Sequence, residues 1–282
     1  MPDWPAFIDP SDLAPGDSVP HAELPRELRL VVAEKVDSAP FETGFRLLGE
    51  YFSAAGEMEI RPVLEQRMNW DPVRPEGRER LLYQMMLLYC GDECVAVRDH
   101  TAIMREGVED VVVHLSHVLV TPKWRRRGLA AILRTLPVST ARECARRAGR
   151  AAAPVTLFCE MEPRDPAQPA NIIRRRSYEG ANFKALGSRL GYMQPDFRSP
   201  TDIDADPAGT RPIPFDILLR RVGRENAQDV PAAELHSGVD LVYSMYAKGF
   251  RESDMRPCLD WLESFRARPD KHYPLHMPTQ AP

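Results

Sequence analysis

The sequence lacks a hydrophobic run long enough to cross a membrane and contains few cysteines. Its longest apolar stretch, Leu81–Cys90, is short and is interrupted by Gln84, whereas a transmembrane helix needs about 20 apolar residues. The first residues are acidic and proline-rich, without the basic and apolar regions of a signal peptide. Five cysteines are an odd number and thinly spread, which argues against a secreted disulfide framework. We therefore expect a cytosolic protein with reduced thiols and no membrane partner.

The chain also lacks an excess of basic charge. Its formal net charge is −4, whereas domains that bind nucleic acids usually carry a basic imbalance, so we expect no nucleic-acid partner. No group of His, Cys, Asp and Glu has the spacing of a metal site, and we expect no metal. The 282 residues are 43% hydrophobic, which is ordinary for a globular protein that needs no covalent cross-link.

Proline is abundant, with 27 residues that concentrate at the two ends and in loops. Residues 1–22 contain five prolines and are predicted to form an extended arm, and residues 269–282 are predicted to be a disordered tail. Residues 23–225 are predicted to form one domain. A helical extension over 226–268 follows, with helices near 232–249 and 252–267.

The hydrophobic pattern of the central domain predicts an α+β fold. Its period alternates between that of helices and that of strands. Three strands joined by short turns indicate an antiparallel meander, and the helix that follows it should kink at Pro137. The predicted order begins with a helix over 41–56 that ends at Gly56 and strands over 81–90, 94–104 and 108–120. A segment over 121–149 follows, in which a basic loop leads through Gly128 into a helix. A strand over 153–163, a helix over 172–190, and strands over 192–197 and 215–222 that pair across a loop complete the order. This order predicts a mixed, mainly antiparallel, twisted sheet flanked by helices.

The segment between the third strand and the next helix has the features of an anion site. It reads VLVTPKWRRRGLAA from Val118 to Ala131. Pro122 ends strand pairing because it has no N–H to donate, and Gly128 opens the helix. The first N–H groups of a helix have no intrahelical partner and carry partial positive charge, and three arginines add to that field. Together these features favour a phosphate or pyrophosphate. A solvated basic turn is the alternative interpretation.

The pattern Arg-x-x-Gly-x-Ala, formed by Arg125, Gly128 and Ala130, resembles motif A of the GNAT superfamily of N-acetyltransferases, [Arg/Gln]-x-x-Gly-x-[Gly/Ala]. The resemblance covers about residues 41–222. It implies acetyl-CoA as cosubstrate, with the pyrophosphate on the loop amides and the pantetheine arm beside the preceding strand. It also implies that strands 111–120 and 153–160 splay apart to admit the thioester. The cofactor-binding residues it implies are Val118, Leu119, Val120, Arg125, Arg126, Arg127, Gly128, Leu129, Ala130 and Ala131.

Direct transfer of an acetyl group to an amine needs a base for the amine and benefits from an acid for the thiolate. His114, on the motif strand, is the first candidate base because an imidazole titrates near neutral pH. His117 follows at odd spacing and is expected on the opposite face of the strand. Glu160 and Glu162 end the next strand and share a face, where one could bind or deprotonate the amine. A histidine packed in the sheet and surface carboxylates at a strand end are the alternatives.

The acid is harder to assign. The family often places a tyrosine in its last helix, about five residues before the aromatic of a Gly-aromatic pair. Here Gly191 and Tyr192 form that pair, and Gly187 falls where the tyrosine should be. Tyr192 and Tyr178 are the substitutes.

Two functions therefore stay open at this point. One is an acetyl-CoA-dependent N-acetyltransferase that acts on a small-molecule or peptide amine. The other is a non-catalytic GNAT-like domain that binds CoA or acyl-CoA as a sensor or scaffold, which the missing tyrosine slightly favours. The C-terminal helices are left with two roles, a cap over the acceptor site or the contact of a homodimer.

Overall fold

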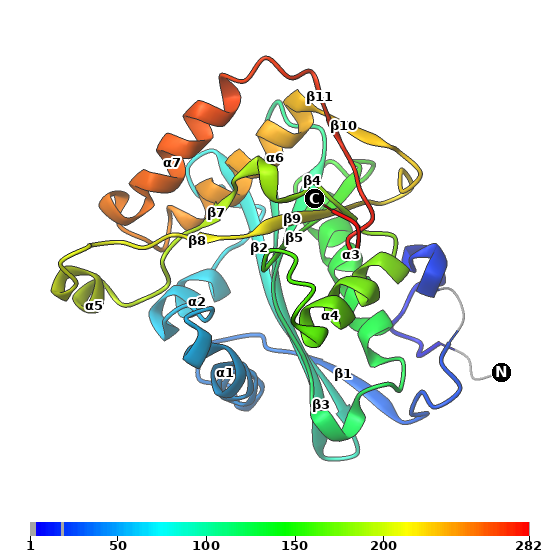
Figure 1. Ribbon diagram of the computed structural model, residues 1–282. Helices are drawn as coiled ribbons and strands as arrows, with labels where there is room; N and C mark the ends of the chain where they lie inside the picture. Colours follow the sequence, from blue (N-terminus) through cyan, green and yellow to red (C-terminus); the bar gives the residue numbers. More distant parts are fainter. Residues whose placement is uncertain (1–3, 18–19, 282) are drawn as a thin grey trace.

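The computed structural model describes residues 4–17 and 20–281. Its main sheet has the strand order β1-β2-β3-β4-β5-β9-β6. Neighbouring strands are antiparallel except β4 and β5, which are parallel. The predicted mixed, mainly antiparallel sheet is thus confirmed (Figure 1). The strands are β1 (Leu28–Val32), β2 (Glu79–Cys90), β3 (Glu93–Arg105), β4 (Val111–Val120), β5 (Val155–Met161), β6 (Lys184–Ala185) and β9 (Asp216–Arg221).

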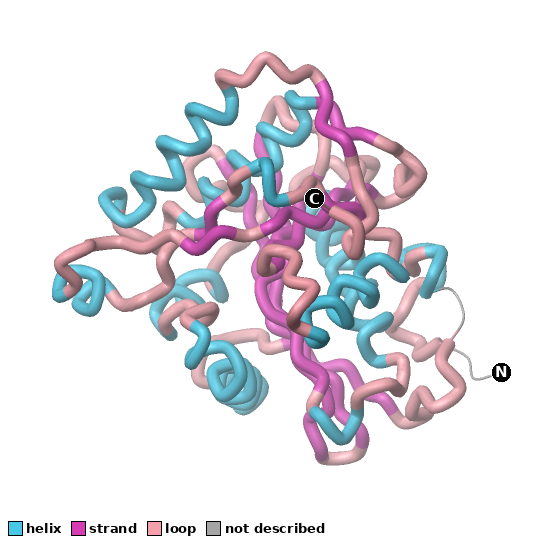
Figure 2. The backbone as a smooth tube through the Cα atoms, viewed as in Figure 1, coloured by secondary structure: helices cyan, strands magenta, loops and turns pink. Residues whose placement is uncertain are grey.

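Helices cover both faces of this sheet, and the strands run between them (Figure 2). One face carries α1 (Ala39–Phe52), α2 (Arg61–Met68), α6 (Ala232–Tyr246) and α7 (Glu252–Arg266), and the other carries α3 (Leu129–Arg147) and α4 (Pro169–Gly180). Strands covered on both sides need apolar residues on both sides. In β3, Val97 and Ile103 pack toward the first face and Ala96 and Ala102 toward the second. This explains why the central strands are continuous apolar runs.

Local backbone geometry confirms the predicted stop at Gly56 and explains where α1 begins. Ser38 caps α1 by accepting a hydrogen bond from the N–H of Phe41. A short 3₁₀ turn follows α1 and ends at Gly56, whose φ of 71° is the left-handed conformation that glycine adopts most readily. Helix α3 continues through Pro137. Within the described residues, no helix has the length and apolar character needed to cross a membrane.

The helix predicted over 172–190 is wrong in its second half. Helix α4 ends at Gly180, and Asn182 then adopts a φ of 60°. Residues Lys184–Ala185 form β6 at the edge of the sheet, paired with β9. Gly187 therefore lies outside any helix, with a φ of 77°. The expectation that a helical tyrosine belongs at this position has no basis in the fold.

The predicted pairing of 192–197 with 215–222 is correct only for a short ribbon. In that ribbon β7 (Met193–Gln194) pairs with β8 (Ile213–Pro214). Strand β9 instead lies between β5 and β6 in the main sheet. The loop between β7 and β8 contains a short helix, α5 (Pro200–Ala205).

Both ends of the chain are more structured than predicted. The N-terminal arm forms 3₁₀ turns at Pro10–Asp12 and Pro15–Asp17, and it packs Ile8 and Leu13 into the cluster that contains Leu129 and Leu133 of α3. The segment predicted to be a disordered tail forms β11 (His272–Pro274), which pairs with β10 (Asp229–Pro231). That prediction is wrong for residues 269–281, because these residues gain main-chain partners and bury Ala281. The helical extension is present as α6 and α7, and both helices share the hydrophobic cluster of the sheet.

Candidate active site

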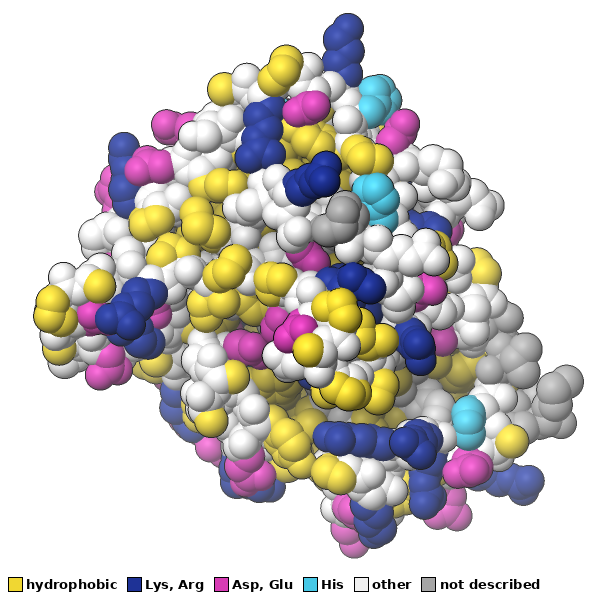
Figure 3. Space-filling model, viewed as in Figure 1, with side chains coloured by type: hydrophobic (Ala, Val, Ile, Leu, Met, Phe, Trp, Pro, Cys, Tyr) yellow, Lys and Arg dark blue, Asp and Glu magenta, His cyan; other side chains and the backbone are white. Residues whose placement is uncertain are grey.

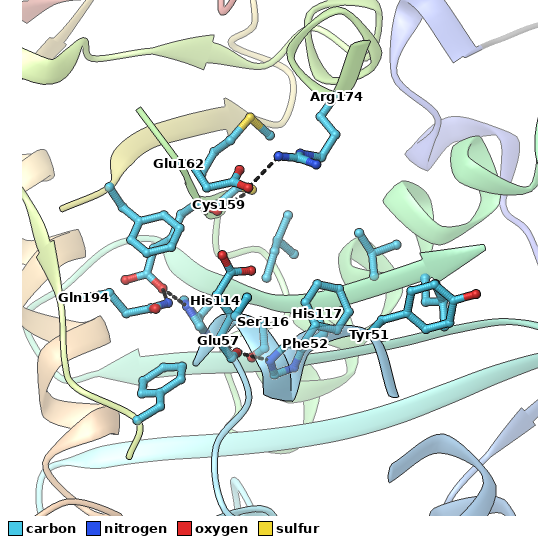
Figure 4. Close-up of a pocket in the computed structure, with 18 of the residues that line it drawn as sticks. Tyr51, Phe52, Glu57, His114, Ser116, His117, Cys159, Glu162, Arg174 and Gln194 are labelled. Carbon is cyan, nitrogen blue, oxygen red and sulfur yellow. Dashed lines mark hydrogen bonds and ion pairs between the residues drawn. The ribbon is translucent and has the colours of Figure 1, made fainter. Parts of the chain in front are cut away.

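The parallel strands β4 and β5 separate in the middle of the sheet. Their pairing runs from Val111 opposite Val155 to Leu115 opposite Cys159, and beyond this point β4 continues to Val120 paired with β3 but not with β5. A cavity of about 420 Å³ opens where the strands part, lined by residues 114–119 of β4 and residues 159–162 that end β5 (Figure 4). The predicted separation of these two strands is therefore present, with a cavity at its apex.

A β-bulge places both histidines of β4 toward this cavity. His114 lies opposite Thr101 of β3 and His117 lies opposite Asp99, so a step of three residues in β4 faces a step of two in β3. The extra residue reverses the alternation of side chains. His117 consequently shares the face of His114, and both line the cavity. The expectation that they occupy opposite faces is wrong.

His114, Glu160 and Tyr192, the three predicted catalytic residues, meet in one buried network. His114 Nε2 lies 2.9 Å from Glu160 Oε2, and the two side chains are only 2% and 3% exposed. The hydroxyl of Tyr192 donates to the other oxygen of Glu160. Gln194 Nε2 and the Tyr246 hydroxyl also donate to Glu160 Oε2, at 2.8 Å and 2.7 Å.

This network keeps Glu160 charged. Burial alone would raise the pKa of the Glu160 carboxyl, but the neighbouring His114 and the hydroxyl donors outweigh burial and lower it. A carboxylate at Nε2 of His114 favours the tautomer that carries its proton there. The lone pair of Nδ1 then points to Ser116, whose Oγ is 3.2 Å away. Glu160 is thus placed to orient the imidazole, and Nδ1 is the basic atom.

Tyr246, which the sequence analysis missed, lines the cavity and joins the network through its hydroxyl. It comes from the end of α6, and its hydroxyl lies 3.0 Å from His114 Nε2. Tyr192 instead packs between Phe158 and Tyr243 behind Glu160. Among the described residues that line the cavity, Tyr246 is present and Tyr192 is not. Burial first, and then the charge of Glu160, raise the pKa of Tyr246 well above that of free tyrosine, so it remains a proton donor. The geometry gives Tyr192 a positioning contact rather than the role of acid.

His117 belongs to a separate, structural ion pair. Its Nδ1 lies 2.9 Å from Asp99 Oδ1, and its Nε2 lies 2.8 Å from the carbonyl oxygen of Glu57. Both ring nitrogens face acceptors, as an imidazolium requires. Burial alone would lower the pKa of His117, but Asp99 outweighs burial and raises it to about 9. The two histidines are held by different carboxylates, and within residues 4–17 and 20–281 no group of three or more His, Cys, Asp or Glu could hold a metal ion.

This ion pair should make the fold less stable as the solution becomes alkaline. The pKa of His117 is raised from an ordinary value of about 6.5 to about 9, so its contribution is complete below pH 6.5 and is lost as the pH rises through 9. We expect the free energy of unfolding, measured with urea, to fall by a few kcal/mol across that interval. His117→Gln should be less stable than the wild type at pH 6 and should lose little further stability as the pH rises to 9. Equal pH dependence in the two proteins would contradict this assignment.

The loop after β4 has the backbone expected of an anion site. Gly128 caps α3 with a φ of 84°, and Arg126 also has a positive φ, 64°. None of the N–H groups of residues 126–130 donates a hydrogen bond to another described residue. Five adjacent amides at a helix N-terminus are therefore free to bind an anion. This arrangement fits the pyrophosphate of CoA.

The side chains of the predicted cofactor segment have varied surroundings. Arg125 lines the cavity and donates through Nε to the carbonyl oxygen of Val120, at 3.1 Å. The guanidinium of Arg127 stacks on Trp124, 4.9 Å from the ring centre, whereas Arg126 is exposed. Leu129 is buried against the N-terminal arm, and Ala130 is half-buried. Val118, Leu119 and Val120 lie on the part of β4 that no longer pairs with β5, so no strand occupies this edge, and the carbonyl oxygen of Val120 is bonded by Arg125.

The remaining lining of the cavity is acidic and aromatic. Glu57 comes from the segment after α1 and Glu162 from the end of β5, and Phe52, Phe197 and Phe215 add apolar surface. Burial first, and then the charge of Glu162, raise the pKa of the Glu57 carboxyl. Glu162 itself pairs with Arg174, which also lines the cavity, whereas Asp165 accepts a hydrogen bond from the N–H of Ala167 in the turn before α4. Acidic and hydrophobic side chains lie side by side near the middle of the face in Figure 3.

Comparison with known proteins gives distant structural similarity. No family model matches the chain, and no curated protein matches it. Among solved structures it is similar to Escherichia coli ElaA, with 13% identity and a TM-score of 0.35 over 69% of this chain and 99% of that one. It is also similar to an acetyltransferase of the GNAT family from Streptococcus pneumoniae, with 13% identity and a TM-score of 0.34 over 69% of this chain and 100% of that one. A third similar structure is an aminoglycoside acetyltransferase from an uncultured soil metagenomic sample, with 14% identity and a TM-score of 0.36 over 54% of this chain and 86% of that one.

Proposed function

We propose that the protein is an acetyl-CoA-dependent N-acetyltransferase that transfers an acetyl group directly from CoA to an amine. One observation carries the proposal: the opening between β4 and β5 combines free helix amides with a buried imidazole on the same strand. The amides of residues 126–130 follow the end of β4, and His114 lies at the apex of the opening. Neither the free amides nor the strand opening contributes hydrogen bonds to the sheet, so the stability of the fold does not explain this combination.

The chain offers a continuous path for the cosubstrate. The amides of residues 126–130 would hold the pyrophosphate, and Arg125–Arg127 add the positive field. The open edge of Val118–Val120 would pair with the pantetheine arm. Acetyl-CoA supplies an activated thioester when bound. At the apex, His114 accepts a proton at Nδ1 while Glu160 stabilises the imidazolium, and Tyr246 holds a proton at the cavity wall.

The case for a non-catalytic sensor weakens. It rested on Gly187 in place of a helical tyrosine, but Gly187 lies outside any helix and Tyr246 offers a hydroxyl from α6. All five cysteines are free, in keeping with the reducing cytosol in which we place the protein.

The acceptor that best fits the cavity is a cationic amine. Glu57, in the segment after α1, and Glu162, just after β5, both line the cavity, and repulsion from Glu162 contributes to the raised pKa of the Glu57 carboxyl. A bound cation would relieve that repulsion. In the Glu57→Gln/Glu162→Gln double variant we expect the KM for a diamine to rise at least about tenfold, with the Kd for acetyl-CoA unchanged. An unchanged KM would exclude these carboxylates from acceptor binding.

Calorimetric titration with acetyl-CoA, CoA and ATP tests the proposal at its first step. We expect micromolar binding of both CoA compounds and weaker binding of ATP, which lacks the pantetheine arm. A panel of mono- and diamines, assayed by release of free thiol, then tests transfer. Absence of CoA binding by the folded protein would overturn the proposal, and binding without turnover on any amine would favour the sensor.

A further inference from the structure

Ser116 occupies a position in the network that none of the assignments above uses. It lies on the β-bulge where β4 leaves β5, and its Oγ is 3.2 Å from His114 Nδ1. On the other side of the ring, His114 Nε2 is 2.9 Å from Glu160. The three side chains therefore form a chain of hydrogen bonds that runs from the cavity into the interior. Figure 4 shows Ser116 beside His114 on the wall of the cavity.

The three hydrogen-bonded side chains differ in burial, and the least buried one lies at the cavity. The side chains of His114 and Glu160 are almost fully buried, whereas Ser116 is half-buried and lines the cavity. A hydroxyl can accept one proton while it donates another. An amine in the cavity can therefore reach the base through Ser116 without direct access to the buried ring.

We propose that Ser116 relays the proton of the acceptor amine to His114. This inference rests on the proposed function and adds a residue to it. One proton leaves the ammonium nitrogen for Ser116 Oγ as the hydroxyl proton of Ser116 moves to His114 Nδ1. The freed electron pair on nitrogen forms the C–N bond to the acetyl carbon, and the C–S bond breaks with its pair on the thiolate. The thiolate takes the proton of the imidazolium, and a second proton leaves the nitrogen for solvent.

The same hydrogen bonds could serve a different chemistry, which the test must separate. A serine next to a histidine that a carboxylate orients is also the arrangement of a nucleophilic serine. In that case acetyl-CoA alone would acetylate Ser116.

Ser116→Thr and Ser116→Val form a matched pair, because the two side chains have nearly the same shape and differ in the hydroxyl. We expect the threonine variant to keep kcat within about threefold of wild type and the valine variant to lose at least about tenfold. The Kd for acetyl-CoA and the KM for the amine should stay within about twofold in both. A packing role would affect the two variants alike.

Two results would overturn the relay. One is wild-type kcat in the valine variant, and the other is an acetyl group on Ser116 in the intact mass of the protein after incubation with acetyl-CoA alone. Nitrogen NMR of His114 provides a readout that needs no turnover, since the relay requires the neutral ring to carry its proton on Nε2. A neutral ring that carries its proton on Nδ1 would exclude the relay. Absence of turnover in the wild type, with the proton on Nε2, would count against the proposed function and not against the hydrogen-bond chain.

Discussion

A His114→Gln variant should bind acetyl-CoA as tightly as the wild type and turn over about 100- to 10,000-fold more slowly, the usual effect of losing a general base. Glutamine can still donate an amide N–H toward Glu160, so the buried carboxylate keeps a partner. It cannot take up a proton at neutral pH. The expected change is therefore in kcat, measured by release of free thiol, and not in the Kd measured by calorimetry.

The choice of glutamine over alanine follows from the surroundings of Glu160. An alanine would leave a carboxylate that is 3% exposed with fewer donors, and an uncompensated buried charge destabilises the fold strongly. Loss of activity could then reflect misfolding. His272→Gln is the matched control, because His272 lies exposed on β11 and, among the described residues, its side chain is hydrogen-bonded only to Asp229. Equal kcat in the two variants would exclude His114 as the base.

The site was predictable where it depends on neighbouring segments of the chain. His114 and Glu160 lie on consecutive strands around the motif, so the resemblance places them at the opening. Tyr246 reaches the same network from 132 residues beyond His114 in the sequence. No local pattern marks it, because its helix has the ordinary amphipathic pattern of a core element. Only the packing of α6 on the sheet brings its hydroxyl to the cavity.

The error over His117 has a precise physical cause. Alternation along a strand predicts opposite faces for residues at odd spacing, and a single inserted residue reverses that rule. The bulge in β4 is visible only in the pairing with β3. It places His117 over Asp99, and the resulting ion pair anchors the carbonyl group of Glu57, and with it the segment that follows α1, to the central strand.

The fold shows the same division between local and distant causes. The long strands β2, β3 and β4 follow from apolar runs separated by tight turns. Strand β6 was mistaken for helix because it is short and its pairing depends on β9, which comes 30 residues later. The proline-rich tail was predicted to be disordered, yet β11 is ordered by β10, which lies far earlier in the chain. Short strands of this kind have no pattern of their own.

An Ala130→Glu variant should lose at least about 100-fold in affinity for acetyl-CoA while its fold becomes slightly more stable. The residue lies in the first turn of α3 and is half-buried. A negative charge there interacts favourably with the helix dipole, by about 0.3–1 kcal/mol. The same charge would repel a pyrophosphate bound to the adjacent amides. Stability measured with urea and Kd measured by calorimetry should therefore change in opposite directions.

Gly128 is a poorer target although it stands at the centre of the motif. Its φ of 84° strains any residue with a side chain, and a Cβ there would come within 2.6 Å of the Cβ of His21 in the N-terminal arm. Loss of binding in a Gly128 variant could come from a displaced arm. Ala130→Gln controls for size at the better position, since it adds the same length without charge, and it should keep most of the affinity. If Ala130→Glu binds acetyl-CoA as the wild type does, the pyrophosphate does not lie on the α3 amides. The free amides would then no longer support the proposed function.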